Sequence, residues 1–273
     1  MSDLDGVSDD PRLDRQFVGA LARGLDILQC YRPQDRDLSH QEIVTRTGLP
    51  KSTVTRLIFT LGHLGFLQQV EESGRYRMGP AVLKLGYAFL ANLDIRRRAQ
   101  PPMQELADYC GVSVGLGLRE GPEMVYVECC RGMAPVTLRL GVGARIDLFR
   151  SIMGRAWLAS RSEEEAAQIA AVLPAAEREV ALTRVRRASE QIGRDGFCRN
   201  RGEWVEGVNS VGAPLMLTDG HTVMALNCGG PEQVVTPDWM EREIGPRLAA
   251  LAAELSVLSP QDLVRQVRTL PSL

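Results

Sequence analysis

In the first part of the chain, the spacing of apolar residues predicts a series of short helices. Over residues 17–31, three leucines fall on one helical face, at Leu21, Leu25 and Leu28. This helix is expected to end before Pro33, because the residue preceding a proline disfavours helical geometry. Ser39 and Glu42 have the spacing of a capping box, which begins a second helix. Gly48 ends it, because glycine readily adopts the left-handed conformation common at helix C-termini.

A third helix is predicted from Pro50 onwards, because proline suits the first turn of a helix. Its apolar stripe has helical spacing, at Val54, Leu57, Ile58 and Leu61. The opposite face and its flanks carry hydroxyls, cations and one aromatic ring, at Lys51, Ser52, Thr53, Thr55, Arg56, Phe59 and Thr60. Hydroxyls bond phosphates or base edges, arginine binds guanine with two hydrogen bonds, and a ring can cover a thymine methyl. Two short helices joined by a tight turn predict a DNA-binding helix-turn-helix.

A β-hairpin is predicted directly after the third helix. Apolar residues over 66–70 and 76–78 suggest two strands, separated by the polar turn 71–74. Arg75 and Arg77 flank a tyrosine, so both cations should lie on one face of the hairpin, available to the DNA backbone or minor groove. An alternative is a protein-docking module whose basic face is simply solvated.

Residues 80–98 are predicted to form one connecting helix. Its apolar residues spread beyond a single face, at Val82, Leu83, Leu85, Tyr87, Phe89, Leu90 and Leu93. Such a surface either packs on its own domain or pairs with a second chain. A protein that reads a palindrome needs two reading heads, which favours a homodimer.

The rest of the chain has a mixed pattern. Alternating apolar positions around a Gly-Pro turn predict an antiparallel hairpin at 112–118 and 125–127. Further strands are expected at 136–140, 145–148, in the second half of 196–217, and at 222–228 after a turn at 218–221. Helices are expected at 101–110, 152–160, 163–172, 184–194 and 238–258. Strands with helices on their faces predict an α+β domain.

Charge separates these two parts. The chain has 273 residues and a net charge of −2, which alone argues against nucleic acid. Residues 11–98, however, hold fourteen bases and eight acids, whereas residues 99–273 hold eighteen bases and twenty-two acids. Only the first part has the net positive charge that binding to DNA phosphates requires. No run of eighteen apolar residues and no signal peptide occurs, so we expect a cytoplasmic protein with reduced cysteines and no membrane contact.

Catalytic and metal-binding motifs are sparse. The sequence contains no GxSxG, P-loop, HExxH or zinc spacing, so we expect no enzyme activity, no metal and no cofactor. Small polar residues near strand ends instead suit the binding of a polar ligand. The first amides of the 152–160 helix could hold its carboxylate. A thiol-dependent enzyme and a domain that only oligomerises remain alternatives.

Five segments resemble the IclR family of bacterial transcriptional regulators: RGLDIL at 23–28, TGLPKSTV at 47–54, GRYRMG at 74–79, MGRA at 153–156 and GVNSVGAP at 207–214. The resemblance implies a winged helix-turn-helix domain, a linker helix and a GAF-like effector-binding domain with an antiparallel sheet. It also implies dimers or dimers of dimers that control catabolic operons in response to small carboxylates or aromatic acids. The expected division is a disordered acidic tail at 1–15, the DNA-binding domain at 16–79, the linker at 80–98, the effector domain at 99–260 and a tail at 261–273.

Candidate site residues follow from the pattern and the resemblance together. The DNA contacts expected are Ser39, Lys51, Ser52, Thr53, Thr55, Arg56, Phe59, Arg75 and Arg77. The resemblance places the effector pocket at Leu138, Ile146, Ile152, Met153, Gly154, Asn200, Val208, Ser210, Asn227 and Gly229. Asn200 stands where some members have an acidic residue, and Asn227 and Gly229 stand where some have a serine pair. With Arg199 and Arg201 nearby, these departures favour an anionic effector.

Overall fold

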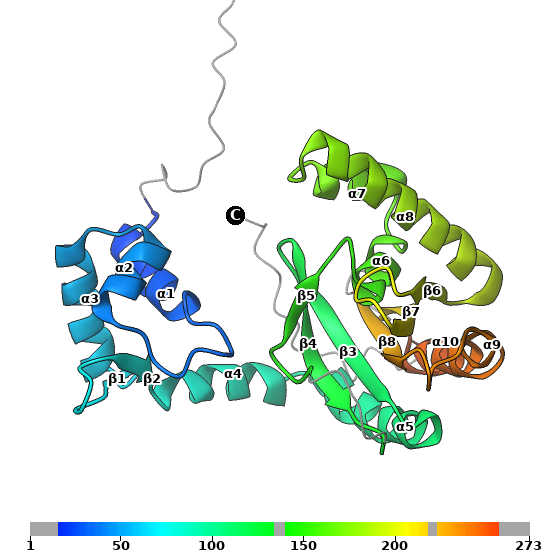
Figure 1. The fold of residues 1–273 in the computed structure, drawn as a ribbon, viewed down its shortest axis with the longest axis horizontal. Coiled ribbons are helices and arrows are strands. Elements are labelled where there is room, and N and C mark those ends of the chain that lie inside the picture. The colour runs from blue at the N-terminus through cyan, green and yellow to red at the C-terminus, as the bar shows by residue number, and fades with distance from the viewer. Residues whose placement is uncertain (1–15, 134–139, 218–222, 257–273) are drawn as a thin grey trace, which may run out of the picture. The chain divides into compact units, whose positions relative to one another are not determined.

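The computed structural model describes residues 16–133, 140–217 and 223–256. These residues form two compact units, which divide between Ala91 and Asn92 (Figure 1).

The first unit is a small helical domain with a hairpin. Its elements are α1 Gly19–Gln29, α2 His40–Thr47, α3 Lys51–His63, β1 Leu67–Gln69, β2 Tyr76–Met78 and α4 Ala81–Ala91. The two strands pair antiparallel, which confirms the predicted hairpin. The core is formed by Ile27, Leu38, Ile43, Val54, Ile58, Leu61 and Leu67. Ser39 and Glu42 form the predicted capping box, and Gly48 ends α2 with a φ of 67°.

The apolar face predicted for α1 packs inside only in part. Gly24 and Ile27 are the buried residues of this helix. Leu21 and Leu25 are instead 63% and 44% exposed. Leu28, the third leucine of the predicted face, is half-buried and packs against the core. Leu21 and Leu25 therefore lie on the surface of the unit, where its own core does not cover them.

The predicted single helix over 80–98 was wrong. The structure ends α4 at Ala91 and begins α5, Asp94–Cys110, after Leu93. The separate helix expected at 101–110 is part of α5, which continues through two prolines. Its buried residues recur at helical spacing on both sides of the prolines, at Ile95, Ala99, Met103, Leu106 and Cys110. Packing of this continuous face compensates for the helix hydrogen bonds that the prolines remove.

The second unit is built on an antiparallel six-stranded sheet with the order β5-β4-β3-β8-β7-β6. The strands are β3 Ser113–Glu120, β4 Glu123–Cys130, β5 Arg145–Asp147, β6 Cys198–Arg201, β7 Val208–Met216 and β8 Val223–Pro231. The helices are α5, α6 Ile152–Leu158, α7 Glu163–Ala170, α8 Ala175–Asp195, α9 Pro237–Trp239 and α10 Gly245–Ser256, with a π-helical turn at Met240–Ile244. Helix α6 packs on β7 and β8, and α5 and α10 also pack on the sheet (Figure 1). The predicted α+β architecture is confirmed.

Several boundaries differ from the sequence prediction. Helix α8 begins at Ala175 rather than near residue 184. Its buried residues are mostly alanines, which give a weak hydrophobic signal. Strand β6 was not predicted. The predicted turn at 218–221, and all but the last residue of the predicted strand at 136–140, lie outside the described residues. Among the helices that are described, none has the length and apolar character to cross a membrane.

Candidate DNA-reading face and effector cavity

Helix α3 presents a polar face to solvent. Val54, Ile58 and Leu61 bury the opposite stripe, as predicted. The exposed side chains are Lys51, Ser52, Thr55, Arg56, Phe59 and Thr60, while Thr53 is half-buried. Within the described chain the Arg56 guanidinium has no carboxylate partner, so it is free to bind an external acceptor.

Two side-chain pairs shape this face. The Thr55 hydroxyl donates to the Lys51 carbonyl at 3.0 Å and lies 2.9 Å from His40 Nε2, at the first residue of α2. His40 was not among the predicted contacts, because its approach to α3 depends on how the two helices pack. The Phe59 ring is 67% exposed and lies 4.1 Å from the His63 ring, centroid to centroid.

The two hairpin cations differ in their surroundings. Arg75 is half-buried and forms ion pairs with Asp37 and Glu42, the latter at 2.7 Å. Hydrogen bonds from Ser39, together with Arg75, hold the pKa of Glu42 below its usual value. Arg77 is exposed and donates a hydrogen bond of 3.3 Å to Gln68. Arg75 is thus engaged within the domain, and so is the capping Ser39 hydroxyl, whereas Arg77 remains available.

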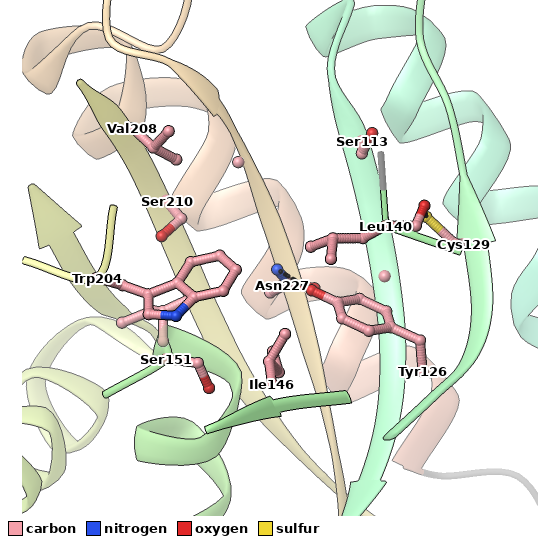
Figure 2. Close-up of a pocket in the computed structure, with 13 residues that line it drawn as sticks. Ser113, Tyr126, Cys129, Leu140, Ile146, Ser151, Trp204, Val208, Ser210 and Asn227 are labelled. Carbon is pink, nitrogen blue, oxygen red and sulfur yellow. Dashed lines mark hydrogen bonds between the residues drawn. The ribbon is translucent and has the colours of Figure 1, made fainter. Parts of the chain in front are cut away.

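A small cavity lies on one face of the sheet in the second unit (Figure 2). Strand register sets its floor, because Ser210, Gly229 and Ser113 are cross-strand neighbours on β7, β8 and β3. Asn227 and Gly115 form the next pair along the same face. The cavity volume is about 20 Å³, which accommodates about one water molecule.

Gly115 determines how Tyr126 lies in this cavity. A Cβ at position 115 would lie 2.2 Å from the Tyr126 ring and 2.6 Å from Asn227 Oδ1. The glycine therefore lets the tyrosine ring lie against the strand. There the Tyr126 hydroxyl accepts a hydrogen bond of 3.1 Å from Asn227 Nδ2. Burial raises the pKa of Tyr126 well above its usual value, so this phenol stays protonated.

Some polar atoms at this site lack partners. Ser113 Oγ and Asn227 Oδ1 line or adjoin the cavity, are buried, and have no hydrogen-bond partner among the residues that the structure describes. Asn200, paired with Ser210 in the sheet, also has an unpartnered Nδ2. Buried polar atoms without partners cost about 1–3 kcal/mol each. A ligand that supplied hydrogen bonds here would recover that free energy.

An ion pair between the buried Arg155 and the half-buried Glu203 lies beside the cavity. Arg155, in α6, is only 1% exposed and donates to Glu203 Oε2 at 2.8 Å. Glu203 also contacts Arg187 of α8, and its backbone N–H donates to Asn200 Oδ1 at 2.9 Å. Burial alone would raise the pKa of Glu203, but the two arginines hold it below its usual value. These contacts fix the start of the connection between β6 and β7.

Comparison with known proteins identifies the family. Residues 87–257 match the family model for the bacterial transcriptional regulator IclR C-terminal domain. Residues 20–71 match the model for the IclR helix-turn-helix domain. The chain belongs to the IclR family. It is therefore a transcriptional regulator, in a family that is not enzymatic.

Individual relatives of this IclR regulator agree over most of its length. The HTH-type transcriptional regulator TsaQ1/TsaQ2 of Comamonas testosteroni is 30% identical over 260 residues, covering 91% of this chain and 92% of the relative. The crystal structure of an IclR family regulator from Brucella abortus is 39% identical, with a TM-score of 0.79 and coverage of 91% and 95%. An IclR homologue from Microbacterium hydrocarbonoxydans, solved in complex with 4-hydroxybenzoate, shares the fold at 21% identity, with a TM-score of 0.70 and coverage of 89% and 98%.

The structure brings together part of the predicted effector set. The predicted residues that line the cavity are Ile146, Ile152, Val208, Ser210, Asn227 and Gly229. Leu138 lies outside the described residues. Met153, Gly154 and Asn200 lie beside the cavity but are not among the described residues that line it. Gly154 has a packing role, because a Cβ there would lie 2.0 Å from the Leu148 carbonyl oxygen.

Other lining residues were missed by the sequence analysis. They are Ser113, Gly115, Tyr126, Cys129, Leu140, Ser151 and Trp204. Small residues alternate along 113–117 in the sequence. This alternation could have indicated that one face of the strand leaves room for a cavity. Nothing local indicated that Tyr126 or Trp204 would face it.

The expected contribution of Arg199 and Arg201 to an anion site was wrong. Both alternate with Asn200 along β6, so they point to the other face of the sheet. Arg199 pairs with Asp195 at 2.6 Å, and Arg201 pairs with Glu241. Within the described part of the chain, no arginine or lysine lines the cavity.

The first turn of α6 has one of its free amides already satisfied. The Gly154 N–H donates to the Ser151 hydroxyl at 3.1 Å. Carboxylate binding at this turn stays a prediction.

Proposed function

We propose that this regulator binds a palindromic operator as a homodimer and controls a catabolic operon in response to a small aromatic acid. The observation that carries the proposal is the exposed polar face of α3, on which Arg56 has no carboxylate partner among the described residues. The mechanism is linkage: an acid that binds one arrangement of the dimer more tightly shifts the population of the DNA-binding arrangement.

In this proposal α3 lies in the major groove. Arg56 reads a base edge, Phe59 covers a thymine methyl, and Lys51 contacts the backbone. Arg77, on the hairpin, contacts the adjacent backbone or minor groove. Footprinting of the DNA upstream of the neighbouring operon tests the proposal. A protected palindrome supports it, and uniform binding without a protected site contradicts it.

The exposed apolar residues of the first unit support the dimer. Leu83 and Tyr87 of α4 are 73% and 70% exposed, and α4 has no buried residue. Leu21 and Leu25 of α1 are exposed as well. Several large apolar side chains exposed on one helix are typical of a surface that another chain covers. Of the two alternatives predicted for α4, packing on its own domain or pairing with a second chain, this exposure supports pairing.

The lining of the cavity supports an aromatic acid as effector. Tyr126, Trp204 and Ile146 provide aromatic and apolar contacts, while Ser113 Oγ and Asn227 Oδ1 are free to pair with polar groups of a ligand. Apolar walls with a few polar groups are typical of small-molecule sites. The Microbacterium relative in complex with 4-hydroxybenzoate gives a member of this ligand class to test.

Isothermal titration against a panel of aromatic and short aliphatic acids tests the effector. Ser113→Ala is the informative variant, because the hydroxyl it removes has no partner in the described part of the chain. We expect this variant to fold normally but to bind the acid about two- to tenfold more weakly. Ser189→Ala, on the exposed surface of α8, is the matched control. No binding by any acid, together with no effect on operator affinity, would contradict the proposed effector class.

A further inference from the structure

The cavity is too small for the ligand class proposed above. Its volume is about 20 Å³, whereas a cavity that takes up benzene measures roughly 150 Å³. If an aromatic acid binds there, one wall of the cavity has to move. The structure indicates which wall that is.

Most of the lining is held in place on several sides. Strands β3, β7 and β8 each pair with strands on both edges, so they cannot shift without breaking ladder hydrogen bonds. Ser151 and Ile152, at the start of α6, are buried. The Tyr126 ring is fully buried, lies against Gly115 and is hydrogen-bonded to Asn227.

Apart from Ser151, which caps the start of α6, two lining residues belong to no helix or strand, namely Leu140 and Trp204. They differ in how they are held. The Leu140 carbonyl accepts hydrogen bonds from Arg131 Nη2 at 3.1 Å and from Cys129 Sγ at 3.4 Å, which tie it to the end of β4. Trp204 is half-buried, and its indole N–H has no hydrogen bond to any residue that the structure describes. Its side chain can therefore move without losing a polar contact.

The backbone around Trp204 favours a local movement. The segment is bounded by Gly202 and Gly207, which have φ values of 71° and 73°. Such glycines absorb changes in backbone direction at little cost. Glu203, directly before the tryptophan, is fixed by Asn200 and by the buried Arg155. Glu203 thus holds the start of the loop in place, directly before Trp204. The indole ring of Trp204 can therefore move while the start of the loop does not.

Figure 2 shows how the Trp204 indole lies relative to the other side chains of the cavity. The Trp204 and Tyr126 rings lie on opposite sides of the cavity, with Asn227 between them. A planar ring that enters between the two would contact an aromatic face on at least one side. Its polar substituent would lie near Asn227 Oδ1, which lacks a partner.

We propose that Trp204 is the movable wall of the effector cavity, and that its indole packs on the ring of the bound acid and selects aromatic acids over saturated ones. This inference rests on the proposed effector class. Trp204 is thus a specificity-determining residue that contacts the ligand, and Glu203 is the residue that positions it.

The test compares benzoate with cyclohexanecarboxylate, which has the same charge and a similar size but no aromatic face. Isothermal titration is carried out on the full-length chain and on two variants. Trp204→Phe keeps a ring, and Trp204→Leu keeps an apolar side chain without one. We expect the wild type and Trp204→Phe to prefer benzoate, and Trp204→Leu to lose about two- to tenfold of that preference. Trp239→Phe, on α9 away from the cavity, is the control.

Tryptophan fluorescence gives a second readout. Benzoate should change the emission of the wild type and of Trp239→Phe, and most of that change should be absent in Trp204→Phe. Equal benzoate preference in the wild type and Trp204→Leu, with the fluorescence change kept in Trp204→Phe, overturns the role of Trp204 and leaves the proposed effector class intact. If neither these acids nor 4-hydroxybenzoate bind the wild type, the effector class fails, and the role of Trp204 fails with it.

Discussion

Replacing Gly115 by alanine tests the account of the cavity floor. The added Cβ would lie 2.2 Å from the Tyr126 ring, whereas carbon atoms pack best at about 3.5–4.0 Å. The ring must therefore move by more than an ångström, and the cavity is the open space beside it. Overpacking of this kind costs about 1–3 kcal/mol. Loss of the Tyr126–Asn227 hydrogen bond adds about 0.5–1.5 kcal/mol.

The expected destabilisation is therefore about 1.5–4.5 kcal/mol, which lowers Tm by roughly 3–18 °C for a unit of this size. Differential scanning calorimetry measures the shift, and titration with benzoate should show that binding is lost. Gly193→Ala is the matched control, because a Cβ at that position of α8 meets no atom within 4 Å. Alanine is also a better helix former than glycine, so the Tm of the Gly193→Ala protein should be unchanged or higher than that of the wild type. A Gly115→Ala protein with the Tm and ligand affinity of the wild type would refute the reasoning.

Three further results are expected. Arg56→Ala should weaken specific operator binding by ~1–3 kcal/mol in a gel-shift titration, with its fold retained, and an unchanged affinity would remove Arg56 from the reading face. Tyr87→Glu should shift the protein from dimer to monomer in sedimentation velocity without loss of helix signal, because the side chain is 70% exposed; a dimer of unchanged affinity would exclude α4 from the interface. Hydrogen bonds from Arg194 and Arg199 lower the pKa of Asp195 from 3.8 to about 2. Its stabilising contribution is therefore fully present above about pH 4 and is lost as the pH falls through about 2, so Asp195→Asn should be less stable than the wild type at pH 7, and the difference should shrink steadily between pH 4 and pH 2; a difference that is as large at pH 2 as at pH 7 would contradict this.

The sequence predicted those parts of the fold that depend on local chemistry. Ser39 and Glu42 form the expected capping box. Gly48 takes the expected left-handed conformation. These features need only residues a few positions apart. The apolar stripe of α1 shows the limit of such evidence, because periodicity reveals an apolar face but not whether that face covers its own core or another chain.

The cavity depends on contacts that are distant in sequence. Gly115 and Tyr126 lie on different strands, and their fit depends on a register that no local pattern encodes. The position of Trp204 depends on Glu203 reaching Arg155, 48 residues away. Residue type alone also could not show that Arg199 points away from the site, because β6 had not been predicted. The resemblance supplied the polar residues of the pocket, and the structure added its aromatic walls.

We expect a ligand in the cavity to change the affinity of the protein for DNA. Fluorescence anisotropy with the footprinted operator measures this directly, with and without an acid that binds in titration. We predict that saturating acid changes operator affinity by about fivefold or more, which is typical of coupled sites, and that Ser113→Ala needs a higher acid concentration for the same change. An operator affinity that is identical with and without bound acid would contradict the account.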